Sequence, residues 1–269
     1  TADRLQSGAI SGIQMRLAAI SDIHGNLHAL DIVLADLKAS GGPDTLWLLG
    51  DFAASAPRPA ECIQRLQALA EEWGEGKIAF VRGNTDRYLV TGARPAGKPA
   101  QDVEAFARLV PGRREWAANL EWGLEQLSFA EYEWLTKLRG ETDIEAPGYG
   151  HVIGYHGTPG DDEGMLTPET TDEEAEDSLL DREGRLGIGA HIHRHMNRPL
   201  GAWRAVNIGS AGMSFDRPGH AQYGIFTFAD GDLQVDLRAI PYDVETVIDD
   251  LRARGYPGLE RQAQRLRTG

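Results

Sequence analysis

Short apolar runs of strand length alternate with stretches of helical periodicity along the chain. The apolar runs, several of them bounded by Gly or Pro, predict strands at 15–21, 45–50, 78–82, 151–156, 186–190, 203–208, 222–228 and 232–240. Between the first two runs, the apolar positions from Leu27 to Leu37 recur with the period of a helix, which predicts one amphipathic helix. A second helix is expected from Pro59 to about Trp73, because proline suits the first helical turn.

The order of these elements predicts the fold class and the domain organisation. Alternation of strands and helices at the start indicates βαβ units, and the strand-rich stretch 186–240 indicates antiparallel or mixed additions, so we expect an α/β protein. Residues 92–127, with a helical pattern around Trp116 and Trp122, are interpreted as a cap-like insertion or a long connection. We expect one domain over 15–269.

The polar residues 1–14 lack the apolar core of a secretion signal, which favours a flexible N-terminal extension or a remnant of cloning. The single cysteine, Cys62, cannot form an internal disulfide, so the fold needs no oxidising compartment. These two features favour the cytoplasm as the location of the protein.

Composition and charge exclude several classes of protein. The chain has 269 residues, 41% of them hydrophobic and 25% charged, which is a globular composition. No apolar run approaches the roughly 18 residues that span a bilayer, so we expect no membrane segment. The formal charge of −14 argues against binding to bulk nucleic acid or anionic lipid, because both need clustered Lys and Arg. A small anionic substrate is still compatible with this net charge if the binding site itself is locally positive.

The segment 161–177 carries nine acidic residues and no Lys or Arg. It could be a calcium or partner site. An exposed loop followed by a helix N-terminus, whose dipole tolerates acidic side chains, is the interpretation we favour.

Side chains that can bind a metal (Asp, Asn and His) follow five of the predicted strands, directly after each strand ends. In open α/β sheets, ligands bind in the crevice beyond the carboxyl ends of the strands. Seven side chains are expected to meet at that edge: Asp22, His24, Asp51, Asn84, His156, His191 and His193. Seven nitrogen and oxygen donors are too many for one tetrahedral zinc. They suit two cations that share a ligand, such as manganese, iron, zinc or cobalt.

The order of these motifs resembles the calcineurin-like metallophosphoesterase superfamily, and more closely its small bacterial and archaeal single-domain branch. The resemblance rests on Ser21-Asp22-Ile23-His24-Gly25-Asn26, Gly50-Asp51, Gly83-Asn84-Thr85-Asp86, His156-Gly157-Thr158-Pro159, His191-Ile192-His193 and Asn207-Ile208-Gly209-Ser210, and it covers about residues 15–240. It implies a four-layer α/β/β/α sandwich of two mixed sheets with a dimetal site between the sheet edges.

The resemblance also implies a role for each ligand. Asp22, His24 and His193 would hold one metal, and Asn84, His156 and His191 the other, with Asp51 bridging the two. Asn26, Arg82, Arg87 and Arg194 lie next to motif residues and are candidates for contacting phosphate. Asp86 is a candidate for orienting a ligand or capping a turn.

The expected reaction is hydrolysis of a small phosphodiester or phosphomonoester by a hydroxide that bridges the two metals, with Asp51, Asn84 and His156 as the central residues. Many superfamily members carry His directly after the Asn, as a leaving-group acid, whereas this chain has Thr85. A good leaving group, or a proton from solvent, His28 or His195, would then be needed, which favours phosphodiesters, such as cyclic nucleotides, or aryl-type monoesters over simple alkyl monoesters. The alternative is a catalytically silent scaffold with the same fold. Such a protein should lack some of the histidines, and here none is missing.

Overall fold

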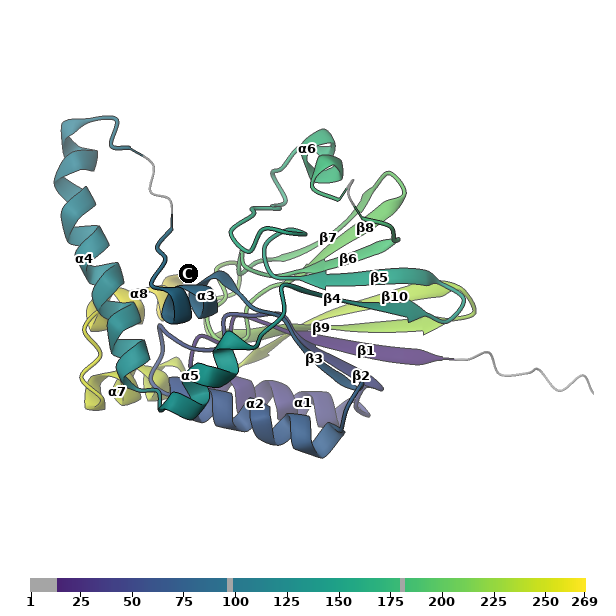
Figure 1. Cartoon of the computed structure of the whole chain (residues 1–269), viewed down its shortest axis with the longest axis horizontal. Coiled ribbons are helices and arrows are strands. Elements are labelled where there is room, and N and C mark those ends of the chain that lie inside the picture. Colours follow the sequence, from purple (N-terminus) through teal and green to yellow (C-terminus); the bar gives the residue numbers. More distant parts are fainter. Residues whose placement is uncertain (1–13, 96–98, 180–181) are drawn as a thin grey trace, which may run out of the picture.

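The fold is described from a computed structural model of residues 14–95, 99–179 and 182–269. The N-terminal extension expected over 1–14 lies, apart from Gln14, outside the described residues. The described chain forms two five-stranded sheets packed face to face, with helices gathered mainly on one side (Figure 1).

The first sheet contains the strands nearest the N-terminus and the C-terminal hairpin, in the order β10-β9-β1-β2-β3. Its strands are β1 (Met15–Ile20), β2 (Thr45–Leu48), β3 (Ile78–Phe80), β9 (His220–Ala229) and β10 (Asp232–Pro241). β1, β2 and β3 run parallel, whereas β9 is antiparallel to both β1 and β10. The carboxyl ends of the three parallel strands therefore lie at one edge.

The second sheet has the order β4-β5-β6-β8-β7. Its strands are β4 (Glu141–Ala146), β5 (Gly150–Tyr155), β6 (Leu186–Gly189), β7 (His195–Leu200) and β8 (Trp203–Ile208). The three central strands run parallel and the two edge strands antiparallel, so both sheets are mixed.

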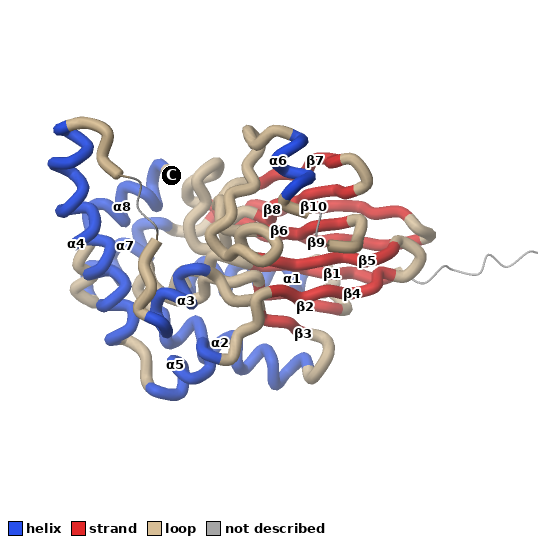
Figure 2. The backbone as a smooth tube through the Cα atoms, turned by 45° about the horizontal axis from the view of Figure 1, so that its top comes forward, coloured by secondary structure: helices blue, strands red, loops and turns tan. Residues whose placement is uncertain are grey.

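The helices other than α6 (Asp172–Asp177) lie on the side of the first sheet: α1 (Leu27–Ala39), α2 (Pro59–Trp73), α3 (Asn84–Thr91), α4 (Val103–Glu125), α5 (Phe129–Thr136), α7 (Val244–Ala253) and α8 (Leu259–Thr268). Of these, α1 and α2 run along its outer face, whereas α3, α4, α7 and α8 gather beyond one end of its strands (Figure 1). The second sheet is covered by α6 and the loops around it, on the opposite side of the molecule (Figures 1 and 2).

Three apolar clusters hold these layers together. The largest joins the helices to the first sheet, and it includes Leu30, Ile63 and Ile248. A second cluster, with Trp47 and Phe226, fills the space between the two sheets. A third packs the α6 region against the outer face of the second sheet. The predicted α/β/β/α sandwich of two mixed sheets is confirmed.

Sequence analysis missed the two edge strands of the second sheet. β4 reads Glu-Thr-Asp-Ile-Glu-Ala and has few apolar positions, because only part of it is buried. β7 contains Pro199, and proline is tolerated in strands mainly at a sheet edge, where one side of the strand needs no backbone donor.

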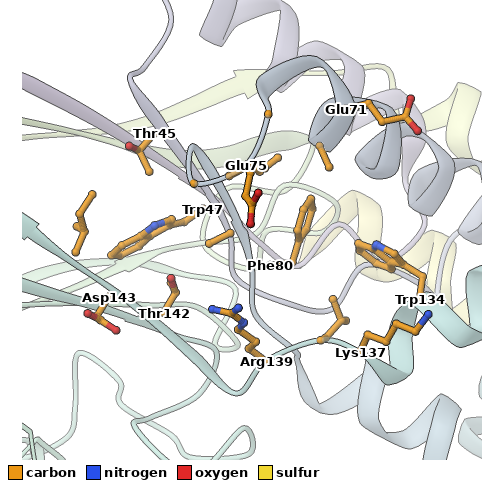
Figure 3. A pocket seen from close by; sticks show the side chains of 17 residues that line it. Thr45, Trp47, Glu71, Glu75, Phe80, Trp134, Lys137, Arg139, Thr142 and Asp143 are labelled. Carbon is orange, nitrogen blue, oxygen red and sulfur yellow. The ribbon is translucent and has the colours of Figure 1, made fainter.

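An open edge of the sandwich holds a cavity of about 790 Å³ between β2, β3, β4 and α5 (Figure 3). Trp47, Phe80 and Trp134 line it together with polar side chains such as Glu75 and Arg139. It does not include any of the seven predicted metal ligands, so the candidate chemistry lies elsewhere.

Candidate metal centre

The predicted ligands follow the carboxyl ends of strands from both sheets. Asp22 and His24 come after β1, Asp51 after β2, and Asn84 opens α3 after β3. The second sheet contributes its ligands in the same way, with His156 directly after β5 and the pair His191 and His193 after β6. Because the two sheets face each other, both sets of strand ends meet, and the ligands are mostly buried.

Five of the seven side chains lie on backbone in the left-handed region. The φ angles are +52° at Asp22, +55° at His24, +56° at Asp51, +71° at His191 and +56° at His193. This conformation is unfavourable for residues other than glycine and costs on the order of 1–3 kcal/mol each. Such strain persists where surrounding contacts enforce it, and it gathers at functional sites. Its concentration here makes the strand ends the candidate functional region of the chain.

Asp86 holds the loop that carries Asp51. Its Oδ2 accepts hydrogen bonds from the backbone N–H of Asp51 at 2.8 Å and of Gly83 at 3.0 Å, and its Oδ1 accepts one from Phe52 at 3.0 Å. Burial, together with the nearby Asp51 carboxylate, raises the pKa of Asp86 to about 7. The geometry therefore gives Asp86 the turn-capping role, with the effect of positioning Asp51.

Two imidazoles are oriented by backbone carbonyls. His156 Nδ1 donates to the Leu49 carbonyl at 2.7 Å, and His193 Nδ1 donates to the Met213 carbonyl at 2.6 Å. Each hydrogen bond leaves Nε2 directed towards the carboxylates. Metal-binding histidines are typically held in this way, because the second nitrogen then keeps its lone pair for the ion.

A first group of donors surrounds Asp22. His193 Nε2 lies 3.2 Å and His24 Nε2 lies 3.7 Å from Asp22 Oδ1, and the two imidazole nitrogens are 3.1 Å apart. Asp22 Oδ1 is buried and receives no hydrogen bond from any of the described residues. A buried carboxylate oxygen without a partner is costly. The donor types and this orphaned oxygen fit a cation held by Asp22, His24 and His193.

A second group combines Asp22 with Asp51 and His156. Asp51 Oδ2 lies 3.5 Å from His156 Nε2 and 3.6 Å from His24 Nε2, so it stands between the two groups. Asn84 Oδ1 is 3.0 Å from His156 Nε2, and in a neutral His156 whose Nδ1 donates to Leu49 both of these atoms are acceptors. A proton or cation between them would relieve this contact.

His191 lies beside the second group of candidate ligands without belonging to it. Its ring centroid is 5.1 Å from that of His156, and its backbone N–H donates to Asp22 Oδ2 at 3.0 Å. Burial lowers the pKa of the His191 imidazole, which favours the neutral form that can bind a metal.

The electrostatics of the centre favour positive charge. Burial by itself would lower the pKa of His156, but Asp51 and Asp22 outweigh it and raise the pKa to about 10. Burial would likewise raise the pKa of Asp22, yet His193 and His156 hold it well below its usual range. Two ionised carboxylates in one buried space need compensating cations, which protons on the imidazoles or bound metals can supply.

The predicted phosphate contacts fall into two pairs. Arg82 and Arg87 border a cavity of about 290 Å³ that also includes His156. Arg87 Nη2 lies 2.7 Å from Asp162 and 2.6 Å from Glu163, and Arg82 Nε lies 3.8 Å from Asp162. The first residues of the acidic segment 161–177 therefore pair with arginines beside the ligands.

Arg194 and Asn26 are placed differently. Arg194 is paired with Glu169 at 3.0 Å on the surface. The Asn26 side chain is buried, and both of its ends are engaged, since Oδ1 accepts from the Ala29 N–H at 3.1 Å and Nδ2 donates to the Gly212 carbonyl at 2.8 Å. Asn26 thus caps α1 and ties it to the loop after β8.

That loop contains two contributors that sequence reasoning missed. The Met213 carbonyl orients His193, and the Phe215 ring stacks on the His193 imidazole with centroids 4.6 Å apart. A backbone carbonyl leaves no signal in the sequence. Phe215 is 40% exposed in the structure. In the sequence, its position shortly after the Asn207-Ile208-Gly209-Ser210 motif was the one indication that it could lie near the site.

The groups considered as leaving-group acids are not in the ligand cluster. His28 Nε2 lies 3.5 Å from Asp250 of α7. His195 follows Arg194 at the start of β7, and burial lowers its pKa. The Thr85 hydroxyl is buried beside Asp51, whose Oδ1 accepts the Thr85 backbone N–H at 2.9 Å.

The chain is thus a two-sheet α/β protein with a cluster of candidate cation ligands between its strand ends. The chain belongs to the calcineurin-like phosphoesterase superfamily, whose domain model matches residues 15–231. The resemblance found in the sequence is thereby confirmed.

Comparisons with solved structures support the same fold. A metallophosphoesterase from Sphaerobacter thermophilus matches with a TM-score of 0.68 at 23% identity, covering 94% of this chain and 98% of that one. A hypothetical protein from Pyrococcus horikoshii OT3 matches with a TM-score of 0.77 at 21% identity, with the same coverage of 94% and 98%.

Among curated proteins, a symmetrical bis(5'-nucleosyl)-tetraphosphatase from Paracidovorax citrulli is 33% identical over 109 residues, which are 40% of this chain and 36% of that protein. The chain therefore aligns with about a third of the length of this relative. Within the described ranges, no helix combines the length and apolarity needed to cross a membrane.

Proposed function

We propose that the protein is a dimetal-dependent phosphoesterase. The observation that carries this proposal is the buried cluster in which Asp22 is shared by two groups of candidate ligands, His24 with His193 and Asp51 with His156. Asn84 and His191 lie beside the second group. Membership of the calcineurin-like phosphoesterase superfamily supports the same reading.

Asp22, His24 and His193 would hold one metal, and Asn84, His156 and His191 the other, with Asp51 between them. A pair of divalent ions supplies Lewis acidity, which activates water and neutralises charge on a phosphoryl group. The chain's own residues supply the frame. Asp86 fixes the loop of Asp51, and the carbonyls of Leu49 and Met213 orient two imidazoles so that Nε2 faces the carboxylates.

The cavity of about 290 Å³ beside His156 is the proposed position of the substrate. Arg82 and Arg87 border it and would contact phosphate oxygens, for which the planar guanidinium is well suited. Arg87 would have to exchange part of its pairing with Asp162 and Glu163 for the substrate. We place Arg194 and Asn26 outside this contact, because neither lines the cavity: Arg194 pairs with Glu169 on the surface, and the buried Asn26 caps α1.

The proposed substrate is a small phosphate ester, with a preference for phosphodiesters. Thr85 offers no ionisable group at the position after Asn84, so a leaving group that departs without a strong acid is favoured. The similarity to a bis(5'-nucleosyl)-tetraphosphatase supports phosphate esters of nucleotides as the first class to test.

Turnover of bis(p-nitrophenyl) phosphate and p-nitrophenyl phosphate, with and without manganese, tests the proposal. We expect manganese-dependent hydrolysis, faster for the diester. Asp51→Asn and His156→Ala should each lose at least about 100-fold in kcat/KM, because even residues that only support metal ligands are worth 10–100-fold. Asp143→Asn, an exposed carboxylate on β4, is the matched control and should keep full activity.

Circular dichroism should show all three variants folded. Absence of hydrolysis of either ester by manganese-loaded protein would favour the scaffold alternative. Near wild-type turnover in Asp51→Asn would refute the proposed role of the metal centre.

A further inference from the structure

A groove of about 870 Å³ lies along the N-terminal half of α4, away from the ligand cluster. Figure 1 shows α4 at one end of the molecule, with its first turns rising beyond α3 and α8. The groove is lined by Arg94, Pro95, Ala105, Arg108, Leu109, Gly112, Arg113, Trp116, Ala117 and Arg261. These residues come from the segment before α4, from α4 itself and from α8, so no contiguous stretch of sequence displays them together.

The charge of the groove is opposite to that of the protein. Of the described residues, four arginines (Arg94, Arg108, Arg113 and Arg261) and no acidic residue line it, although the chain carries a formal charge of −14. Arg261 is paired with Glu115 at 3.2 Å. Among the ion pairs of the described residues, the other three arginines have no carboxylate partner. The groove therefore presents guanidinium groups to an external anion.

The floor of the groove is aromatic and apolar. Trp116 is half-buried, and its ring packs edge-to-face on that of Tyr88 in α3, with the ring centroids 5.2 Å apart and an interplanar angle of 76°. The Arg94 guanidinium lies 5.8 Å from the Trp116 ring centroid, and Ala105 and Leu109 continue the apolar surface. Inorganic phosphate would use only the arginines. A ligand that also carries a planar apolar group would use both parts.

We propose that this groove binds a nucleotide, with its phosphates on the arginines and its base against Trp116. Guanidinium groups bind phosphate oxygens with charge-assisted, often bidentate hydrogen bonds, and stacking on an aromatic side chain tolerates any base. A volume of this size suits one small molecule. The site is separate from the proposed metal centre, because none of the seven candidate ligands lines it.

Calorimetric titration of the full chain with ATP, in EDTA and moderate salt, tests the proposal without any contribution from metals. We expect saturable binding, with adenosine and tripolyphosphate each binding at least about 10-fold more weakly than ATP. The double variant Arg108→Glu/Arg113→Glu should weaken ATP binding at least about 10-fold, because charged hydrogen bonds are lost and repulsion is introduced. Both arginines are exposed, so the fold should not depend on them.

Arg185→Glu is the matched control. Arg185 is also exposed and lies over an aromatic ring, with its guanidinium 4.8 Å from the Tyr149 centroid, but it is remote from the groove. It should leave ATP binding within about twofold of the wild type. Trp116→Leu should weaken ATP binding and leave that of tripolyphosphate unchanged, provided that its melting temperature shows a folded protein.

Equal ATP affinity in the wild type and in Arg108→Glu/Arg113→Glu would overturn the proposal, as would the absence of ATP binding. Tripolyphosphate bound as tightly as ATP would also overturn it, because Trp116 would then have no part. Loss of ATP binding in Asp51→Asn would place the nucleotide at the metal centre instead. Turnover of bis(p-nitrophenyl) phosphate, measured separately, shows whether the proposed function stands regardless of this result.

Discussion

At the scale of single residues, the centre depends on close approach of two backbone loops. Gly50 has a φ of +95°, and a Cβ there would lie 2.5 Å from the Gly83 nitrogen and 2.8 Å from His156 Nδ1. A Cβ at Gly83 would lie 2.0 Å from Asp51 Oδ1. Only a residue without a side chain fits either position, so these glycines place the Asp51 carboxylate against the start of α3.

Gly83→Ala should therefore displace Asp51 without altering any ligand. We expect kcat/KM for bis(p-nitrophenyl) phosphate to fall about 10–100-fold, the range seen when the support of a metal ligand is removed. Steady-state kinetics in excess manganese measure the effect. Gly112→Ala in α4 is a suitable control, since a Cβ at Gly112 meets no atom within 4 Å, its φ is not positive and it lies outside the cavity beside His156. Equal losses in both variants would argue against displacement of Asp51 as the cause.

At the scale of elements, α1 links the metal loop to the C-terminal hairpin. The helix begins directly after Asn26, which follows His24 in the loop after β1. Near its end, the Asp36 carboxylate accepts hydrogen bonds from the Tyr223 hydroxyl at 2.6 Å and from Arg238 at 2.8 and 3.0 Å. These contacts join α1 to β9 and β10. Burial would raise the pKa of Asp36, but Arg238 and Tyr223 outweigh it and lower the pKa.

The pKa of Asp36 in the folded protein lies below its value of about 4 in the unfolded chain. Ionised Asp36 therefore stabilises the fold fully above about pH 4. This contribution is lost as the pH falls from about 4 through the pKa of the folded protein. Asp36→Asn should lower the free energy of unfolding by about 1–2 kcal/mol at pH 7. The difference from the wild type should shrink below pH 4. Urea denaturation at several pH values measures it. A difference that stays constant down to pH 3 would exclude ionisation of Asp36 as its source.

At the scale of the whole molecule, the candidate ligands come from both sheets. Asp22, His24, Asp51 and Asn84 follow strands of the first sheet, and His156, His191 and His193 follow strands of the second. Bound cations would therefore tie the two halves of the sandwich together at one edge, in addition to the apolar cluster between them. Metal binding should therefore increase the stability of the whole protein against unfolding.

Manganese at about 100 times its dissociation constant should raise the melting temperature by about 5–10 °C, because a ligand at that excess adds about 2.7 kcal/mol. A chelator should reverse the shift. Differential scanning calorimetry measures both changes. Asp51→Asn should show a smaller shift with manganese, whereas Asp143→Asn should behave as the wild type. An equal shift in Asp51→Asn would locate the stabilising metal elsewhere.

The pattern of residues along the chain was enough to predict the fold class and the candidate ligands. The eight predicted strands correspond to strands of the structure, and the apolar runs of most of them are buried between layers. The ligands stood out because polar residues directly after buried strands have no role in packing. The edge strands β4 and β7 escaped notice because a half-buried strand has weak periodicity.

Tertiary structure alone decided what these residues do together. Asn26 and Arg194 neighbour motif residues in the chain, yet their polar groups are engaged by Gly212 and Glu169 from distant segments. Asp86 proved to hold Asp51, and the Met213 carbonyl to orient His193, through contacts that no local pattern encodes. The arginine groove on α4 arises in the same way, from three separate segments. Local periodicity indicates which face of an element is buried. Hydrogen-bond partners and charge clusters depend instead on which distant segments of the chain the fold brings together.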